Sequence, residues 1–511
     1  MRKKFVLAFG LAGLVATAVA LAATGGKTAL VASVHPLDND YQFVSASETP
    51  PTETQCFTVN APSGRRCFTP QSIRSAYNIQ PLYDQGFNGK GQTIAIIDSY
   101  GSDTMPHDLW VFNNAFGLPH LCGEVDASGP ISCSSGMATF SELSLQGSPA
   151  TKPQGGNGTG LEDKTAWALE VALDVEWAHA IAPGANILLV HTPTAETLGV
   201  QGFPQMMMAE DYVVKHHLAT VISQSLASAE EAFASTQSLL NLRYAFEDAR
   251  DNGVTVLGSS GDFGTRNNSK QGLVGNGPNG IIPFPTVEWP ASDPLVTGVG
   301  GTFLCTDPLA PATQPRTVDS ADPPPQCPQN PGVAEIGWVG SGGGFSHVFL
   351  RPSYQDALPA GSTPIPQGQR GVPDIAYNAS SRTGVLIYLS LPPQGLSGAI
   401  CRPSGSPCST GWYIIGGTSA GSPQWAGLIA IADQINGGGL GLINPALYKI
   451  GANSARYASD FFDVTTGNNT QPGDPVVAGY SATTGWDPVT GLGTPNAARL
   501  LPDLVAAVHG N

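Results

Sequence analysis

A serine at a glycine-rich turn is the first feature of this chain that could do chemistry. The segment GGTSAGSPQWAG, residues 416–427, places Ser419 where the turn enters a helical pattern, which is typical of an exposed nucleophile. A serine hydroxyl needs a base to take its proton, and the usual base is histidine. The next histidine along the chain is His509, third from the end. The sequence therefore predicts either a turn residue without chemistry or a base other than imidazole.

Two carboxylates on one helix could supply that base. The stretch WALEVALDVEWAHAI, residues 167–181, places Glu170 and Asp174 four residues apart, so both side chains project from one helix face. Their neighbours are apolar, and a desolvated pair of like charges is unfavourable unless the two groups share a proton. A shared proton leaves one carboxylate as a proton acceptor in acid. The alternative is an exposed acidic stripe on a surface helix.

A third carboxylate follows a buried strand. In GSSGDFG, residues 258–264, Asp262 lies between glycines at the carboxyl end of that strand. A carboxyl group that stays protonated there could donate a hydrogen bond to an oxyanion. An Asx-turn is the alternative explanation for an aspartate in this position.

The elements that must position these residues alternate between strand and helix. Continuous apolar character predicts strands buried on both faces, and the alternation predicts an α/β fold with a doubly wound, mostly parallel sheet and helices on both faces. In such sheets, sites lie outside the carboxyl ends of the strands. The predicted strands are 93–98, 186–191, 220–225, 254–260 and 412–417, and the predicted helices are 163–181, 204–217, 235–252 and 419–435.

Composition places the chain among exported proteins that act on something other than nucleic acid. The 511 residues carry a net charge of -16, without the clustered Lys and Arg that a nucleic-acid surface needs. The first 22 residues have a basic start, an apolar run and a small-residue end, as in a secretory signal peptide; an uncleaved membrane anchor is the alternative. No later stretch is long and apolar enough to span a bilayer. We expect a secreted, extracellular protein without stable membrane association once the signal is removed.

The eight cysteines agree with export, because an even count in an exported chain favours disulfides. Pairing between sequence neighbours is the simplest connectivity. The neighbouring pairs are Cys56/Cys67, Cys122/Cys133, Cys305/Cys327 and Cys401/Cys408.

Taken together and in this order, the motifs resemble the sedolisins, or serine-carboxyl peptidases, which have a subtilisin-like fold and act in acid. The nucleophile turn GGTSAGSP, the acid-pair helix EVALD followed by APGANI, and the loop SSGDFG carry the resemblance. Supporting matches include SGGGFS (341–346), RGVPDIAYNA (370–379) and GWDPVTGLGTPN (485–496), and the resemblance covers about residues 67–505. It implies a peptidase domain over 67–511, preceded by an arm (23–66) that is too short for the family's usual pro-domain and that we expect to be poorly structured.

The resemblance also implies roles for single residues. Ser419 would be the nucleophile, Glu170 its general base and later acid, and Asp174 the group that orients Glu170. Asp262 would complete the oxyanion hole together with the Ser419 backbone N–H. Asp98, in IAIIDSYG, falls where some relatives carry a further carboxylate next to the acid pair; an acid at the end of a strand, without a role in catalysis, is the alternative. The expected activity is endopeptidase cleavage of protein or peptide substrates by a monomer.

One structural Ca²⁺ near the C-terminus is also implied. Asp463 and Asp487 match the family's carboxylate ligands, and the carbonyls of Val464, Thr483 and Gly485 would complete an oxygen cage, which suits a hard cation. Two aspartates in turns are the alternative.

Three other protein classes are alternatives to a sedolisin-like enzyme. The string Gly417–Gly421 also fits G-x-S-x-G of the α/β-hydrolases, with Asp463 or Asp487 and His509 as partners of an esterase, but His509 lies at a chain end and no HGG-type oxyanion loop precedes the serine. An ordinary subtilisin is disfavoured because the chain has no His-Gly-Thr segment, and His179, on the acid-pair helix, is expected to be a structural or surface residue. A non-catalytic exported binding protein on the same fold is the third alternative.

Overall fold

The computed structural model describes residues 41–59, 64–145, 161–193, 202–268, 280–311, 314, 316–319, 326–392 and 409–510, with the side chains of 161–166 left out. The predicted signal peptide (1–22), the first part of the arm and the Cys401/Cys408 pair lie outside the described residues. Within the described ranges, no helix has the length and apolarity needed to cross a membrane.

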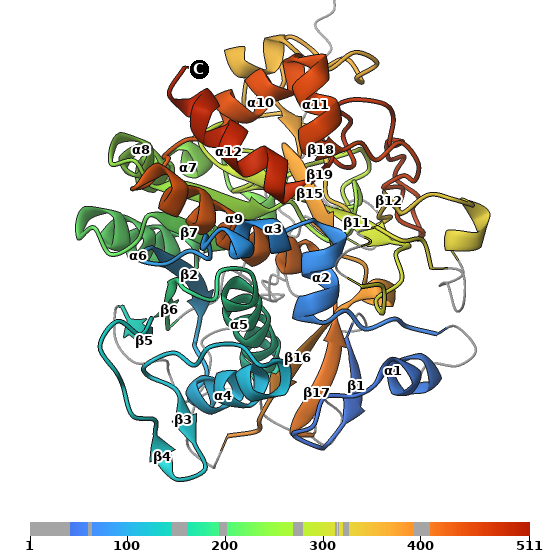
Figure 1. Ribbon diagram of the computed structural model, residues 1–511. Coiled ribbons are helices and arrows are strands. Elements are labelled where there is room, and N and C mark those ends of the chain that lie inside the picture. The colour runs from blue at the N-terminus through green and yellow to red at the C-terminus, as the bar shows by residue number, and fades with distance from the viewer. Residues whose placement is uncertain are drawn as a thin grey trace, which may run out of the picture.

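A mostly parallel sheet forms the centre of the fold (Figure 1). In the part of the chain that the structure describes it has eight strands, in the order β12-β11-β9-β7-β2-β6-β5, with β15 also paired to β11. All of these pairs are parallel except β11 with β12. The four strands predicted between residues 93 and 260 are its central members, and their near-complete burial explains their continuous apolar character. The strands are β2 (Thr93–Ser99), β5 (Phe140–Ser144), β6 (Asn186–Thr192), β7 (Val221–Gln224), β9 (Thr255–Ser259), β11 (Thr297–Leu304), β12 (Glu335–Gly337) and β15 (Ile375–Asn378).

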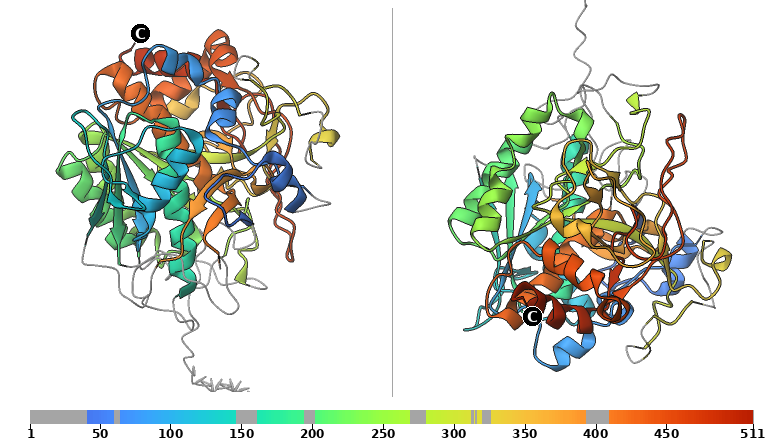
Figure 2. Two further views of the ribbon diagram at one scale, coloured as in Figure 1. Left: turned by 60° about the horizontal axis from the view of Figure 1, so that its bottom comes forward. Right: turned by 90° about the horizontal axis from the view of Figure 1, so that it is seen from above.

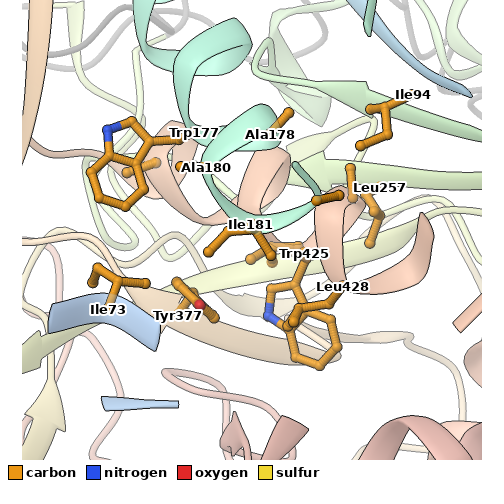
Figure 3. Close-up of a cluster of buried hydrophobic side chains, with 14 of the residues drawn as sticks. Ile73, Ile94, Trp177, Ala178, Ala180, Ile181, Leu257, Tyr377, Trp425 and Leu428 are labelled. Carbon is orange, nitrogen blue, oxygen red and sulfur yellow. The ribbon is translucent and has the colours of Figure 1, made fainter. Parts of the chain in front are cut away.

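Helices cover both faces of this sheet, as Figure 2 shows. Alternate residues of β2 face different cores: Ile94 and Ile96 pack with α5 and α9, whereas Ala95 and Ile97 pack with α6 and α8. In the first core, Ile181 of α5 lies close to Trp425 of α9 (Figure 3). Trp177 of α5, Leu428 of α9, and Ile94 and Leu257 of the sheet belong to the same core. The helices are α1 (Glu53–Val59), α2 (Pro70–Ala76), α3 (Gln80–Asp84), α4 (Met105–Phe116), α5 (Leu161–Ile181), α6 (Phe203–Lys215), α7 (Thr236–Leu240), α8 (Tyr244–Asp251), α9 (Gly421–Asn436), α10 (Asn444–Ala452), α11 (Ser454–Asp460) and α12 (Ala497–Val508).

The prediction that 412–417 joins the parallel sheet is wrong. This segment is β17, and it pairs antiparallel with β16 and with β1 in a separate three-stranded sheet. A buried β-branched run looks the same in either kind of sheet, so the sequence could not separate them. The predicted helix 235–252 is divided into α7 and α8 by a turn at residues 241–243. The remaining strands are β1 (Gln42–Ser45), β3 (Val125–Asp126), β4 (Gly129–Pro130), β8 (Ser228–Ala229), β10 (Glu288–Trp289), β13 (Gly344–Phe345), β14 (Gly371–Val372), β16 (Val385–Leu389), β17 (Gly411–Ile415), β18 (Phe461–Phe462) and β19 (Thr494–Pro495).

The described part of the N-terminal arm is ordered, which corrects the expectation of a poorly structured segment there. Strand β1 lies beside β17 although the two are far apart in the sequence (Figure 1). Phe43 packs edge-on against Tyr413. Helix α1 is tied to the body by the Cys56–Cys67 disulfide. A short polar segment can thus become ordered by pairing with the edge of an existing sheet. Local periodicity in the sequence does not predict such pairing.

Sequential pairing of the cysteines is confirmed for three of the four predicted disulfides. Disulfides join Cys56 to Cys67, Cys122 to Cys133 and Cys305 to Cys327.

Candidate active site

Ser419 lies in a tight turn between the end of β17 and the start of α9. Gly417 precedes it with φ 118°, a conformation that L side chains rarely adopt, and a Cβ there would stand 2.7 Å from Asp262 Oδ2. Ser419 itself belongs to a 3₁₀ turn over Thr418–Ala420 that leads directly into the helix. The serine is buried rather than exposed as the motif predicted. A glycine is therefore needed at position 417 because the turn is closely packed there and its backbone has a positive φ.

The acid pair lies on a buried stretch of α5, so the alternative of an exposed acidic stripe is excluded. Glu170 is 1% exposed and Asp174 is fully buried. Asp174 Oδ1 accepts a hydrogen bond of 2.9 Å from the hydroxyl of Ser225, which follows β7 directly. The same hydroxyl is 3.4 Å from the carbonyl oxygen of Ser419. One polar side chain thus connects the acid pair to the serine turn.

Burial and mutual repulsion favour the protonated forms of these acids. Burial, followed by the charges of Asp98 and Asp262, raises the pKa of Glu170 well above its usual range, while the hydroxyls of Ser419 and Ser225 act in the opposite direction. Burial, followed by Asp98 and Glu170, raises the pKa of Asp174. Burial raises the pKa of Asp98, on β2, to about 8. Carboxyls this close cannot all be ionised, so the cluster holds protons that it can share.

The serine hydroxyl faces a carboxylate rather than an imidazole. The interaction of Ser419 with Glu170 favours the charged form of that carboxyl. Among the described residues, however, neither Ser419 Oγ nor either Glu170 oxygen has a partner at hydrogen-bond geometry. Catalytic hydrogen bonds are often long in ligand-free structures and tighten when substrate binds.

Asp262 is held beside the serine by Thr418. Its Oδ1 accepts hydrogen bonds from the Thr418 backbone N–H (2.7 Å) and hydroxyl (2.8 Å). The Thr418 hydroxyl in turn accepts one from the backbone N–H of Gly261. These contacts fix the orientation of the carboxyl next to the first turn of α9.

Three residues of this site were not predicted from the sequence. Ser225 and Thr418 are described above, and Glu288, on β10, is a buried carboxyl whose pKa is raised by burial and by the charge of Asp262. A Cβ at Gly261 would stand 2.0 Å from Glu288 Oε2. For Ser225, the available signal was its place at the carboxyl end of a predicted strand; for Thr418 it was its position next to the serine. Glu288 carries no motif, and only the tertiary fold brings it here.

The predicted calcium ligands also lie together. The backbone N–H of Gly485 is 3.2 Å and 3.1 Å from the two carboxylate oxygens of Asp463, and Asp487 accepts a hydrogen bond of 3.0 Å from the Thr483 N–H. Val464 follows Asp463 directly in the chain. Burial raises the pKa of Asp487 to about 7. The described residues contain no group of three or more His, Cys, Asp or Glu suited to a metal, so this site offers two carboxylates and backbone oxygens. Such all-oxygen ligands fit a hard cation such as Ca²⁺.

Known peptidases are similar to this chain in sequence and in fold. Kumamolisin from Bacillus sp. (strain MN-32) is 30% identical over 440 residues, which cover 86% of this chain and 64% of that protein. The solved structure of Pseudomonas sedolisin, a serine-carboxyl proteinase complexed with two molecules of pseudo-iodotyrostatin, aligns with 88% of this chain and 99% of that chain, at a TM-score of 0.58 and 25% identity. This chain belongs to the sedolisin family.

Members of the sedolisin family have the subtilisin-like α/β fold that this chain shows. Human tripeptidyl-peptidase 1 is a further relative, 28% identical over 363 residues, and the chain spans 53% of its length. The chain thus covers less than two thirds of these curated relatives. No family model matches the chain.

The α/β-hydrolase arrangement is wrong for this fold. His509 Nε2 is 2.6 Å from Asn436 Oδ1, at the far end of α9 from Ser419. At 1.5 Å per residue, that helix separates the two by roughly 25 Å. His179 is buried, and its Nε2 is 2.9 Å from the Pro119 carbonyl oxygen, which agrees with the structural role expected of it.

Proposed function

We propose that this chain is an acid-acting serine-carboxyl peptidase that cleaves peptide bonds through an acyl-enzyme on Ser419. The observation that carries the proposal is the link between the buried Glu170–Asp174 pair and the turn of Ser419, because the Ser225 hydroxyl reaches both Asp174 Oδ1 and the Ser419 carbonyl oxygen. The arrangement of Asp262 on Thr418 and the family relationship support it.

The proposed reaction forms an acyl-enzyme and then hydrolyses it. The Ser419 oxygen attacks the carbonyl carbon of the scissile bond while its proton passes to Glu170, and Asp174 stabilises the transfer. The carbonyl oxygen becomes an oxyanion, to which protonated Asp262 and the Ser419 N–H donate hydrogen bonds. When the C–N bond breaks, Glu170 returns the proton to the leaving amine. A water molecule, with Glu170 again as base, then releases the acid product and restores the hydroxyl.

We also propose a secreted enzyme with one structural calcium ion. Three disulfides fit an oxidising compartment. Asp463, Asp487 and the carbonyls of Val464, Thr483 and Gly485 would hold the ion.

The test is digestion of an intrinsically unstructured protein across pH 3 to 8, with the products identified by mass. Wild-type protein should cleave fastest in acid, because Asp262 must donate a hydrogen and the acid pair must hold only part of its protons. Ser419→Ala should lower kcat by roughly 10⁴-fold or more while the melting temperature stays close to wild type. Internal fragments are expected from an endopeptidase, whereas successive tripeptides would assign tripeptidyl release.

Two controls separate the alternatives. Hydrolysis of a simple ester without any peptide cleavage would make the chain an esterase, and saturable binding of peptides without turnover would make it a binding protein. A rate maximum near pH 8, or full activity of Ser419→Ala, would rule out the proposed roles.

A further inference from the structure

Ser225 occupies the junction between the acid helix and the serine turn. It follows β7 at the carboxyl end of the central sheet and is fully buried. Its hydroxyl donates to Asp174 Oδ1 at 2.9 Å and lies 3.4 Å from the Ser419 carbonyl oxygen. It also interacts favourably with the charged form of Glu170. The Ser225 hydroxyl therefore lies between Asp174 of the acid pair and the backbone of the serine turn.

The charges around the acid pair explain why such a donor matters. The charge of Asp98, on β2, acts on both acids, and the charge of Asp262, in the loop after β9, acts on Glu170. Both groups are acidic, so each favours a fully protonated pair. Ser225 and Ser419 are the side chains that act against them, and a hydrogen bond in a buried site is stronger than the same bond in water.

We propose that Ser225 is a positioning residue that keeps the Glu170–Asp174 pair from taking up its second proton at the working pH and holds that pair in line with Ser419. The proposal rests on the proposed function. A pair that already carries two protons cannot accept the serine proton. Ser225 therefore sets the lowest pH at which the base works, without touching substrate.

The kinetic test compares Ser225→Ala with Ser223→Ala across a pH series. Ser223 is a matched control, because it is a buried serine two residues earlier whose hydroxyl is 2.9 Å from that of Ser422 rather than from an acid. Ser225→Ala should move the acidic limb of kcat/KM up by about one pH unit and lower kcat in acid by roughly tenfold, with KM unchanged. Ser223→Ala should leave the acidic limb of kcat/KM at its wild-type pH, and Ser225→Thr should return that limb to the wild-type pH. An unmoved limb in Ser225→Ala would overturn the proposal.

A second measurement does not depend on turnover. In a Ser419→Ala background, infrared titration of the protonated carboxyls should give a higher midpoint when Ser225→Ala is added, and Glu170→Gln should identify the band. If wild type cleaves no peptide but this midpoint rises, the proposed function fails and the contact of Ser225 with the pair stands. If the wild-type protein cleaves peptides but Ser225→Ala changes neither the infrared titration midpoint nor the acidic limb of kcat/KM, Ser225 does not position the acid pair. Should Ser225→Ala fail to fold, Ser225→Cys keeps the size, weakens the donor and must raise the same midpoint.

Discussion

At the scale of single residues, the proposed mechanism uses carboxyls in place of an imidazole, and their surroundings set their pKa values. An isolated glutamate is too acidic to hold a proton at moderate pH. Burial and the charge of Asp98 raise the pKa of Glu170, and the hydroxyls of Ser225 and Ser419 limit that rise. Proton affinity here is therefore a property of the cluster, and changes at one member are felt by the others.

Gly417→Ala tests how closely the turn is fitted to Asp262. The new Cβ would stand 2.7 Å from Asp262 Oδ2, and φ 118° is strained for alanine, so the carboxyl must move. A displacement of this kind should lower kcat by roughly 10²-fold while the protein still folds. Steady-state kinetics with a peptide substrate would check this, with Gly438→Ala as control, because a Cβ at Gly438 meets nothing within 4 Å. Equal rates in both variants would contradict the fitted role of Gly417.

At the scale of elements, five separate segments bring the site together. Helix α5 supplies Glu170 and Asp174 from one face, the ends of β2 and β7 supply Asp98 and Ser225, and the start of α9 follows Ser419. The loop after β9 supplies Asp262. Parallel strands end at one edge of the sheet, so a helix packed across that edge meets all of them. The position of α5 against β2 and α9 is thus what turns an i,i+4 acid pair into a candidate base.

Removal of the proposed calcium ion should act on the C-terminal segment around β18 and β19. Asp463 and Asp487 are linked through Gly485 and Thr483, and taking a cation from between two carboxylates leaves them to repel each other. We expect excess chelator to lower the melting temperature, and added Ca²⁺ to restore it while Mg²⁺ does not. The Asp487→Asn variant should have a lower melting temperature than the wild type, both with and without chelator. A wild-type melt that chelator leaves unchanged would remove the metal from the proposal.

At the scale of the whole molecule, several buried carboxyls among the described residues form no salt bridge. Burial raises the pKa of Asp108 to about 6, of Glu230 and Asp433 to about 7, and of Asp98 to about 8. Such groups are accommodated best when protonated. The fold as a whole, and not only the site, is therefore suited to acid.

The stability of the fold should decrease as the pH rises. A carboxyl whose pKa is higher in the folded state binds more protons folded than unfolded, so its contribution is complete below about pH 4 and is lost up to its folded pKa. The window for these groups is pH 4 to 8. We expect the melting temperature of Ser419→Ala protein, used to prevent self-digestion, to fall by more than roughly 5 °C across it. Exposed Asp126 and Asp251, whose pKa values are lowered by local hydrogen bonds, act the other way but are screened by solvent. A melting temperature that rises with pH would contradict this account.

The sequence by itself determined the fold class, the central parallel strands and the acid-pair helix, and it favoured sequential disulfides, which the structure confirms for three pairs. Each follows from a local signal: a buried apolar run, cysteines close along the chain, or two acids four residues apart. Only the tertiary structure decided that 412–417 leaves the parallel sheet, that residues 42–45 complete another, and that Ser419 is buried beside Glu170. It also revealed Ser225 and Glu288, which no spacing connects to the serine. The physical reason is that contacts between residues far apart in sequence depend on how helices pack on the sheet, and local periodicity carries no record of that packing.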